Sequence, residues 1–334
     1  MTAMKKTPGQ FMAAEAGEAT RVFADAVRQS VNIDSLAETH AIYTIARGSS
    51  DAAANILSYE FMRELRVPVT SLPPSVFSIG RGVALTNTAA MIVSQSGASD
   101  DLVRSAIGAK AEGAQVLAVT NQPGSPVEEV ADTTIPIDAG AELAVPATKT
   151  VCGAIGAGMA VLGALTTDYR SRAAKDAATV ANISAYFPQA AEIQSALLRA
   201  RHVYVIGRDT GYGAAIELAL KLKECTAIHA EAYSASEVLH GPLQLATNSL
   251  TVLMLDTGLP ETQDSLDKAE TRLLMENCDF HRLRISDMGV ELHTPAAAAA
   301  LLLAGMYPVI LNTALALGFD PDAPETLSKV TQTT

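Results

Sequence analysis

Tryptophan is absent from this sequence of 334 residues, and aromatic residues together make up 4% of it. Charged residues are also scarce, at 18%, whereas hydrophobic residues make up 49%. The interior must therefore be built from Ala, Val, Ile and Leu, which favours a packed α/β core. At about 150 residues per domain, a chain of this length is expected to form two domains.

Basic residues are too few to balance the acidic ones. The counts are 24 and 36, so the formal net charge is −12. A chain with this charge exerts no long-range attraction on nucleic acid or on anionic lipid. We therefore expect neither a nucleic-acid partner nor a membrane partner.

Cysteine pairs and export signals are missing as well. The three cysteines, Cys152, Cys225 and Cys278, form no C-x-x-C motif, and an odd number cannot all be bridged within one chain. Polar residues at the start of the sequence, among them Lys5 and Lys6, leave no apolar stretch long enough for a signal peptide. Both features predict a protein of a reducing compartment, with the cytoplasm as the expected location.

One long stretch, residues 294–319, carries no charge and has the length needed to span a bilayer. It contains Pro308, Asn312 and many alanines, and it has no basic flanks. These features favour a buried helix pair over a membrane span.

Short β-branched runs alternate with Ala-rich helical patterns along the chain, as in βαβ units with parallel sheets. The predicted strands are residues 41–46, 89–93, 116–120 and 134–137, and then 202–207, 250–256 and 279–285. The predicted helices are residues 52–65 and 100–112, and then 213–224 and 260–275.

The two series resemble each other at a constant spacing. Residues 42–47, Ile-Tyr-Thr-Ile-Ala-Arg, resemble residues 203–208, Val-Tyr-Val-Ile-Gly-Arg, so that Tyr43 and Tyr204 lie 161 positions apart. Gly80 and Gly241 share this spacing without a gap. We predict a duplicated domain, with a helical segment at 1–34, the two copies at 35–168 and 176–320, and a tail at 321–334.

The strongest local signal is the run from Ser94 to Asp100, which lies between a predicted strand and a predicted helix. Hydroxyl groups, one amide and a Gly-relaxed turn at a helix N-terminus form a donor-rich cup that suits a phosphate. The alternative is a simple capped turn with Ser99 as the N-cap.

A second hydroxyl-rich loop, Arg47-Gly48-Ser49-Ser50, follows another predicted strand. Helix capping is again the alternative for Ser49 and Ser50. No G-x-G-x-x-G motif is present, so a dinucleotide site is poorly supported. Ligands of open α/β sheets bind at the carboxyl ends of strands, so the two loops can converge on one ligand.

Lys221 and Glu224 stand at i, i+3 on a predicted helix and can share a face. A carboxylate beside an ammonium in a sheltered cleft can move a proton. The alternative is a surface ion pair with His229 as a core residue. No H-x-x-x-H or H-E-x-x-H motif occurs, so no metal site is predicted. Lys329 lies in a polar tail, and its spacing alone predicts nothing.

Four motifs in this order resemble the double sugar-isomerase (SIS) domain family. They are residues 94–97, residues 140–149, residues 220–224 with 229–233, and residues 237–242. The likeness runs from about residue 40 to the end. Within this family the sequence resembles the isomerase half of glucosamine-6-phosphate synthase and the free-standing glucosamine-6-phosphate deaminases. This resemblance implies two tandem SIS domains, each a parallel sheet flanked by helices in a flavodoxin-like three-layer sandwich.

The resemblance also implies roles for individual residues. Glu224 would be the base that moves a proton between C1 and C2, with Lys221 assisting it. His240 would open the sugar ring in the neighbouring subunit's site, which implies a homodimer. Lys329 would form an imine with a ketose phosphate in a tail that acts as a lid. The residues that would hold the phosphate and the sugar are Ser49, Ser50, Ser94, Gln95, Ser96, Ser99, Glu142, Val145, Ala147 and Ser328.

The sequence departs from the synthases in two places. It has no leading cysteine nucleophile and no glutaminase domain ahead of the first strand. The Cys-Gly-Thr-Ser of the synthases is replaced by Arg47-Gly48-Ser49-Ser50, as in the deaminases and deglycases. The expected reaction is therefore conversion of glucosamine 6-phosphate to fructose 6-phosphate and ammonia, with no metal or redox cofactor. The alternatives are a fructosamine-6-phosphate deglycase, a synthase-like isomerizing aminotransferase and a non-catalytic phosphosugar sensor.

Overall fold

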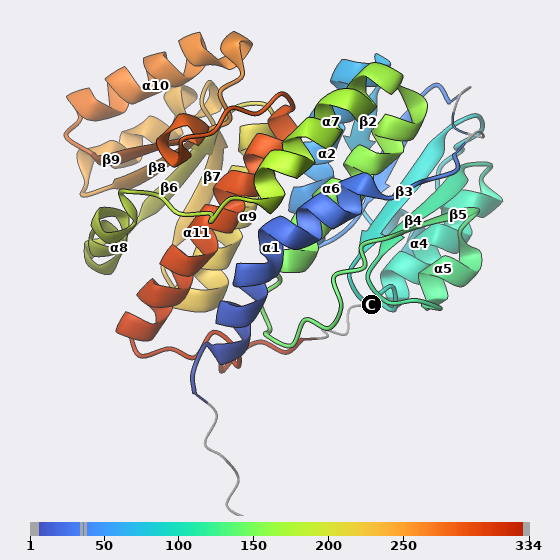
Figure 1. The fold of residues 1–334 in the computed structure, drawn as a ribbon, viewed down its shortest axis with the longest axis horizontal. Helices are drawn as coiled ribbons and strands as arrows, with labels where there is room; N and C mark the ends of the chain where they lie inside the picture. Colours follow the sequence, from blue (N-terminus) through green and yellow to red (C-terminus); the bar gives the residue numbers. More distant parts are fainter. Residues whose placement is uncertain (1–6, 34–35, 37–38, 330–334) are drawn as a thin grey trace, which may run out of the picture.

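A computed structural model describes residues 7–33, 36 and 39–329 of the chain, and it contains two parallel sheets (Figure 1). The first sheet has the order β2-β1-β3-β4-β5. Its strands are β1 (Ile42–Ile45), β2 (Val69–Ser71), β3 (Ala89–Ser94), β4 (Gln115–Thr120) and β5 (Thr133–Pro136). The second sheet has the order β7-β6-β8-β9. Its strands are β6 (Val203–Gly207), β7 (Ala230–Ser234), β8 (Thr251–Asp256) and β9 (Asp279–Arg284). The predicted α/β class with two sheets in tandem is confirmed.

Helices fill the space between the sheets and cover their outer faces (Figure 1). The helices of the first half are α2 (Gly48–Leu65), α3 (Ser75–Ser78), α4 (Asp100–Ala111), α5 (Pro126–Val130), α6 (Lys149–Leu165) and α7 (Thr167–Ala181). Those of the second half are α8 (Ala190–Arg199), α9 (Thr210–Thr226), η2 (Glu237–His240), η3 (Pro242–Thr247), η4 (Pro260–Thr262), α10 (Gln263–Met275), η5 (Ile285–Met288) and α11 (Pro295–Ala316). Helix α1 (Gln10–Arg28) precedes the first sheet and packs on α6, α7 and α11.

The duplication extends to two strands that the sequence patterns did not predict. β2 and β7 are the edge strands next to β1 and β6, and their first residues, Val69 and Ala230, have the same spacing as Tyr43 and Tyr204. β2 buries one residue of three and β7 one of five, so neither shows the buried apolar run of a central strand. Once β2 is known, the spacing between the two repeats gives the position of β7.

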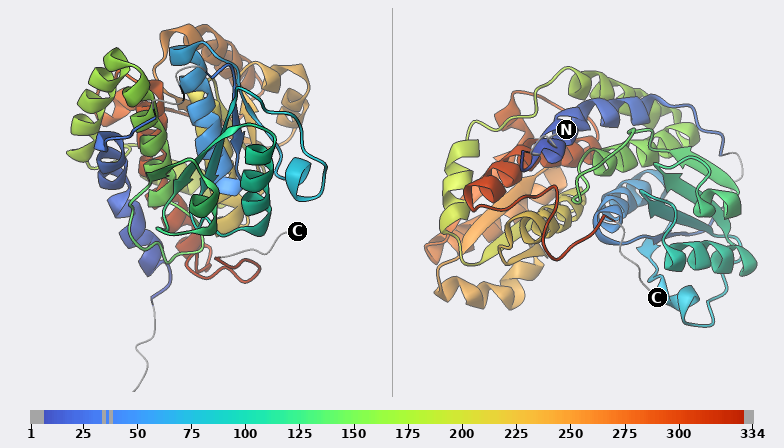
Figure 2. Two further views of the ribbon diagram at one scale, coloured as in Figure 1. Left: turned by 90° about the vertical axis from the view of Figure 1, so that its right-hand side faces the viewer. Right: turned by 90° about the horizontal axis from the view of Figure 1, so that it is seen from below.

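The two halves pack closely through α2 and α9. Gly213 of α9 faces α2, and a Cβ on it would lie 2.7 Å from the backbone nitrogen of Ile56. The first turn of α2 lies beside the last two turns of α9, where Lys221 Nζ donates to Ser49 Oγ. Figure 2 shows, in the view from below, the two sheets lying on opposite sides of this central helical layer.

The prediction of a helix pair over residues 294–319 is wrong, because α11 is one helix of 22 residues. Pro308 lies inside it, and both Pro308 and Asn312 are on its exposed side, one turn apart. Among the described residues, α11 alone is long and apolar enough to cross a membrane. However, 83% of its apolar window is buried inside the protein, as in the core helix of a globular fold.

Candidate active site

The two hydroxyl-rich loops meet the C-terminal half of α9 around one cavity of about 260 Å³. Most of the predicted site residues line this cavity: Ser49, Ser50, Gln95, Ser96, Ser99, Val145, Ala147, Lys221, Glu224, Ser328 and Lys329. Arg47, Gly48 and Leu327 line it as well. The structure therefore brings together loops of the first half, helix α9 of the second half and the tail.

The conformation of the loop after β3 requires a glycine, because the loop packs closely on Ser125. Gly97 has φ +59°, and a Cβ there would lie 2.1 Å from Ser125 Oγ. The Gly97 N–H donates to Ser94 Oγ at 3.1 Å, and this hydrogen bond stabilises the loop. The Ser94 side chain is buried and does not line the cavity. Ser99 is at the N-cap of α4, but its side chain makes no capping hydrogen bond. The capped-turn alternative therefore does not account for the Ser99 hydroxyl.

The loop after β1 carries a residue that the sequence analysis did not assign to the site. Arg47 lines the cavity, and its Nε donates to the buried carboxylate of Asp101 in the first turn of α4. This ion pair ties the start of α2 to the start of α4. Since helix N-termini present N–H groups and a positive dipole end, both loops can accept an anion.

Lys221 is at the centre of a buried charge cluster. Its side chain is 1% exposed, and its Nζ lies 2.5 Å from Glu224 Oε2 and 3.4 Å from Glu217 Oε1. The same ammonium donates to Ser49 Oγ, across the two halves of the chain, at 2.8 Å. The alternative of a surface ion pair is wrong, and so is a core position for His229, which is exposed and lies 3.4 Å from His202.

Glu217 is a member of this cluster that the sequence analysis missed. It lies one turn before Lys221 on α9, so the i, i+4 spacing could have predicted its contact with Lys221. Burial raises the pKa of the Glu217 carboxyl, and the Lys221 ammonium opposes that rise. Burial would lower the pKa of Lys221, but the carboxylates of Glu217 and Glu224 raise it, so the net shift is upward. Glu224, with 26% of its side chain exposed, is the carboxylate of the cluster that faces the cavity.

The tail reaches the site through Lys329. Its Nζ donates to the Ala144 carbonyl at 2.6 Å and lies 3.5 Å from Glu142 Oε2. Glu142 does not line the cavity. Its buried carboxylate accepts from the N–H groups of Thr148 and Thr150, at 3.0 and 3.1 Å, and so holds the loop that carries Val145 and Ala147.

His240 lies outside this cavity in its own chain. It is an exposed residue at the end of η2 and lines a separate hollow of about 280 Å³ together with Arg272 and Glu276 of the α10 region. One chain by itself therefore does not bring the His240 imidazole to Glu224.

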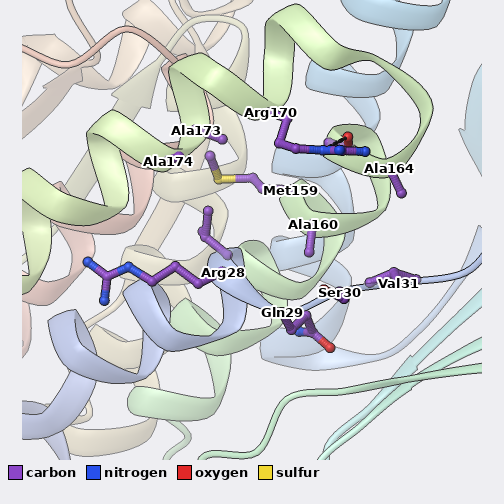
Figure 3. A pocket seen from close by; sticks show the side chains of 12 residues that line it. Arg28, Gln29, Ser30, Val31, Met159, Ala160, Ala164, Arg170, Ala173 and Ala174 are labelled. Carbon is purple, nitrogen blue, oxygen red and sulfur yellow. Dashed lines mark hydrogen bonds between the residues drawn. The ribbon is translucent and has the colours of Figure 1, made fainter.

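A larger hollow of about 480 Å³ lies between α1, α6 and α7 (Figure 3). No carboxylate and no imidazole line it. Its two arginines donate to backbone carbonyls, Arg28 to Ala177 at 3.2 Å and Arg170 to Gly163 at 2.6 Å. It lacks the acid–base groups that the smaller cavity combines. No cluster of three metal-ligating side chains was found among residues 7–33, 36 and 39–329.

The chain is similar to known proteins over most of its length. The family model of the SIS domain matches residues 35–167 and 196–277. Glutamine–fructose-6-phosphate aminotransferase (isomerizing) of Bradyrhizobium diazoefficiens is 29% identical over 307 residues, which are 85% of this chain and 50% of that protein. The chain thus spans about half the length of the curated relatives it matches.

Solved structures share the fold. A protein of Silicibacter pomeroyi, described as a phosphosugar isomerase, is 30% identical with a TM-score of 0.83, over 93% of this chain and 99% of that one. Glucosamine-6-phosphate deaminase of Thermotoga maritima is 18% identical with a TM-score of 0.73, over 97% of this chain and 100% of that one. At this lower identity the second likeness concerns the fold alone.

The buried cluster generates a stability prediction. In Lys221→Met, Glu217 loses its counterion, and we expect the free energy of unfolding to fall by about 3 kcal/mol or more at pH 8. The folded-state pKa of Glu217 then lies still further above its unfolded value. Between the unfolded-state and the folded-state pKa of Glu217, the folded state keeps a proton that the unfolded state releases. Stability therefore falls as the pH rises from the lower to the higher of these two values. The loss should accordingly be smaller at pH 5.

Urea unfolding at both pH values measures this effect, with Lys221→Met/Glu217→Gln as the matched control. The double variant should lose most of the added pH dependence. An equal loss of stability at pH 5 and pH 8 in the single variant would contradict the burial of an ionisable carboxyl behind Lys221.

Proposed function

Since the chain belongs to the SIS domain family, we propose that it is a phosphosugar isomerase that releases ammonia from glucosamine 6-phosphate and forms fructose 6-phosphate. The observation that carries the proposal is the meeting of two hydroxyl-rich loops from one half with the Lys221–Glu224 pair of the other half around one cavity. One end of the cavity suits a phosphate, and the other holds a carboxylate suited to proton transfer.

In the proposed reaction the phosphate binds Ser50, Gln95, Ser96 and Ser99, and this binding places C1 and C2 of the opened sugar at Glu224. The Glu224 carboxylate takes the proton from C2 and returns it to C1. In this step the C2 amine loses a proton and becomes a ketimine, while the C1 aldehyde oxygen gains a proton and C1 becomes a CH₂OH group. Water then adds to C2 and ammonia leaves, which gives fructose 6-phosphate.

The other predicted residues have supporting roles in this proposal. Lys221 orients the Glu224 carboxylate and offsets its charge, as their 2.5 Å contact supports. In this proposal Lys329 and Ser328 close the tail over the sugar, and the amine of Lys329 forms an imine with a ketose. Val145 and Ala147 contact the sugar chain, and Glu142 holds their loop. We place the enzyme in the cytoplasm.

A second candidate function is the release of a larger amine, as in a fructosamine-6-phosphate deglycase. A further hollow of about 580 Å³ shares Glu224 and Leu327 with the site cavity but none of the hydroxyl-rich loop residues. A sugar with its phosphate on those loops and C1 at Glu224 would direct a substituent on its amine toward this hollow. The observation favours the deglycase over the aminotransferase as the second candidate.

Glu224→Gln tests the proposed base. Because removal of a general base costs about 10²- to 10⁴-fold in rate, we expect turnover to fall at least about a hundredfold. Binding of the phosphosugar should change little, because the phosphate contacts lie on other elements. The measurement is a screen for ammonia and amine release from amino-sugar 6-phosphates and fructosamine 6-phosphates, with binding followed by calorimetry.

Each result of the screen decides between the candidates. Ammonia from glucosamine 6-phosphate supports the deaminase, and an amino acid released from a fructosamine 6-phosphate supports the deglycase. Full activity in Glu224→Gln would show that the base is elsewhere. Tight binding without turnover of any substrate, in either direction, would indicate a phosphosugar sensor.

We also propose a homodimer in which His240 of the partner subunit completes each site and opens the sugar ring. The exposed position of His240 supports this arrangement, as do exposed apolar side chains on η3 and α10, namely Leu245, Leu274 and Met275. Apolar residues exposed together are typical of protein interfaces.

Mixing Glu224→Gln with His240→Ala tests the shared site. Each variant alone should be nearly inactive. In a mixed dimer one of the two sites has an intact Glu224 and an intact partner histidine, so random exchange should restore about a quarter of wild-type activity. The control is each variant mixed with itself. If no activity returns although mixed dimers form, His240 does not act across the subunits.

A further inference from the structure

Helix α1 lies outside both sheets and ahead of the SIS match, which begins at residue 35. Its first half nevertheless contacts two parts of the candidate active site that are remote from it in sequence. Figure 1 shows the tail passing the start of α1 after it leaves α11. In each of these contacts a carboxylate accepts hydrogen bonds from backbone N–H groups.

The first contact anchors the tail. Asp320 Oδ1 accepts from the Gly9 N–H at 2.9 Å. Asp322 accepts from the N–H groups of Phe11 and Met12, each at 2.8 Å. The first N–H groups of a helix have no partner within the helix, and its N-terminus favours negative charge. The tail is therefore fixed to α1 shortly before it reaches Lys329.

The second contact anchors the sugar loop. The buried carboxylate of Glu15 accepts from the Leu143 N–H, and its Oε2 accepts from the Ala144 N–H at 3.2 Å. The carbonyl of the same Ala144 accepts from Lys329 Nζ at 2.6 Å. The backbone of Ala144 is thus held by Glu15 on its N–H and by Lys329 on its carbonyl.

We propose that Glu15 is a positioning residue of the active site: by fixing the backbone of Leu143 and Ala144, it sets the place of the Lys329 ammonium over the cavity. The inference rests on the proposed function for the reaction that Lys329 serves. Burial raises the pKa of the Glu15 carboxyl, while the Leu143 and Ala144 N–H groups and the Lys329 ammonium oppose that rise. Glu15 and Lys329 therefore interact by charge as well as through Ala144.

Glu15→Gln tests this role. The glutamine keeps the size of the side chain and one acceptor oxygen, but its NH₂ group faces an N–H donor of the loop. We expect kcat to fall about ten- to a hundredfold, as for the loss of hydrogen bonds to a buried charge. KM should change by less than about threefold, because the phosphate contacts lie on other elements. Acetylation of Lys329 by limiting acetic anhydride, measured by peptide mass spectrometry, should become several-fold faster.

Glu18→Gln is the matched control, one turn further along the same helix. Glu18 pairs with Lys149 at 2.8 Å, and no hydrogen bond from its side chain to the 142–147 loop or to Lys329 is found in the described structure. This variant should leave both kcat and Lys329 acetylation within about twofold of wild type. Both variants should give similar circular dichroism spectra.

Unchanged Lys329 acetylation in Glu15→Gln would overturn the proposal, as would equal effects in both variants. If Glu15→Gln does not fold, Glu15→Asp keeps the charge but shortens the side chain by one methylene group, so that it no longer reaches both loop N–H groups. Unchanged acetylation of Lys329 in that variant overturns the proposal instead. Acetylation needs no turnover, so its result is separate from the proposed reaction. A wild-type protein that turns over no amino-sugar phosphate would refute that reaction, whereas the acetylation comparison would still decide whether Glu15 positions Lys329.

Discussion

The buried ammonium of Lys221 is the point at which the two halves of the site are joined. Burying an ammonium without partners costs several kcal/mol, so its position requires the carboxylates of Glu217 and Glu224. The third contact, to Ser49, comes from the other half of the chain. The contact of Lys221 with Glu224 orients that carboxylate toward the cavity. The contact of Lys221 with Ser49 fixes α9 against the first turn of α2. The close approach at Gly213 brings these two helices into register. The proposed base from one repeat and the proposed phosphate loops from the other therefore line one cavity.

Much of this fold could be predicted because duplication adds information to a single sequence. Central strands such as β3 and β8 are buried along their whole length and mostly apolar, and the repeat supports their assignment. The edge strands β2 and β7 were missed because one side of each is partly exposed, so their burial pattern is not that of a buried run. The error at α11 has a similar origin. Pro308 and Asn312 suggested a break, but both lie on the exposed face of a helix that is otherwise packed on all sides.

The parts of the candidate site that depend on residues close together in sequence could be predicted. The parts that depend on contacts between residues far apart in sequence could not. The loops after β1 and β3 follow from the rule that parallel strands end at a common edge. Glu217 was within reach of helix spacing, since it lies one turn from Lys221. The pair of Arg47 with Asp101 and the contact of Glu15 with Leu143 join residues far apart in sequence, and no local pattern marks them. The resemblance had already implied a role for the tail, whereas the contacts of helix α1 with the tail and with the loop of Leu143 and Ala144 are seen only in the folded chain.

The central claim is that one phosphosugar bridges the two repeats, and a crystal structure of Glu224→Gln with glucosamine 6-phosphate bound tests it most directly. We predict that the phosphate lies on the loops of Ser49–Ser50 and Gln95–Ser99, with C1 and C2 in contact with the side chain at position 224. A phosphate bound in the hollow of Arg28 and Arg170, or a sugar whose C1 and C2 do not contact position 224, would contradict the account.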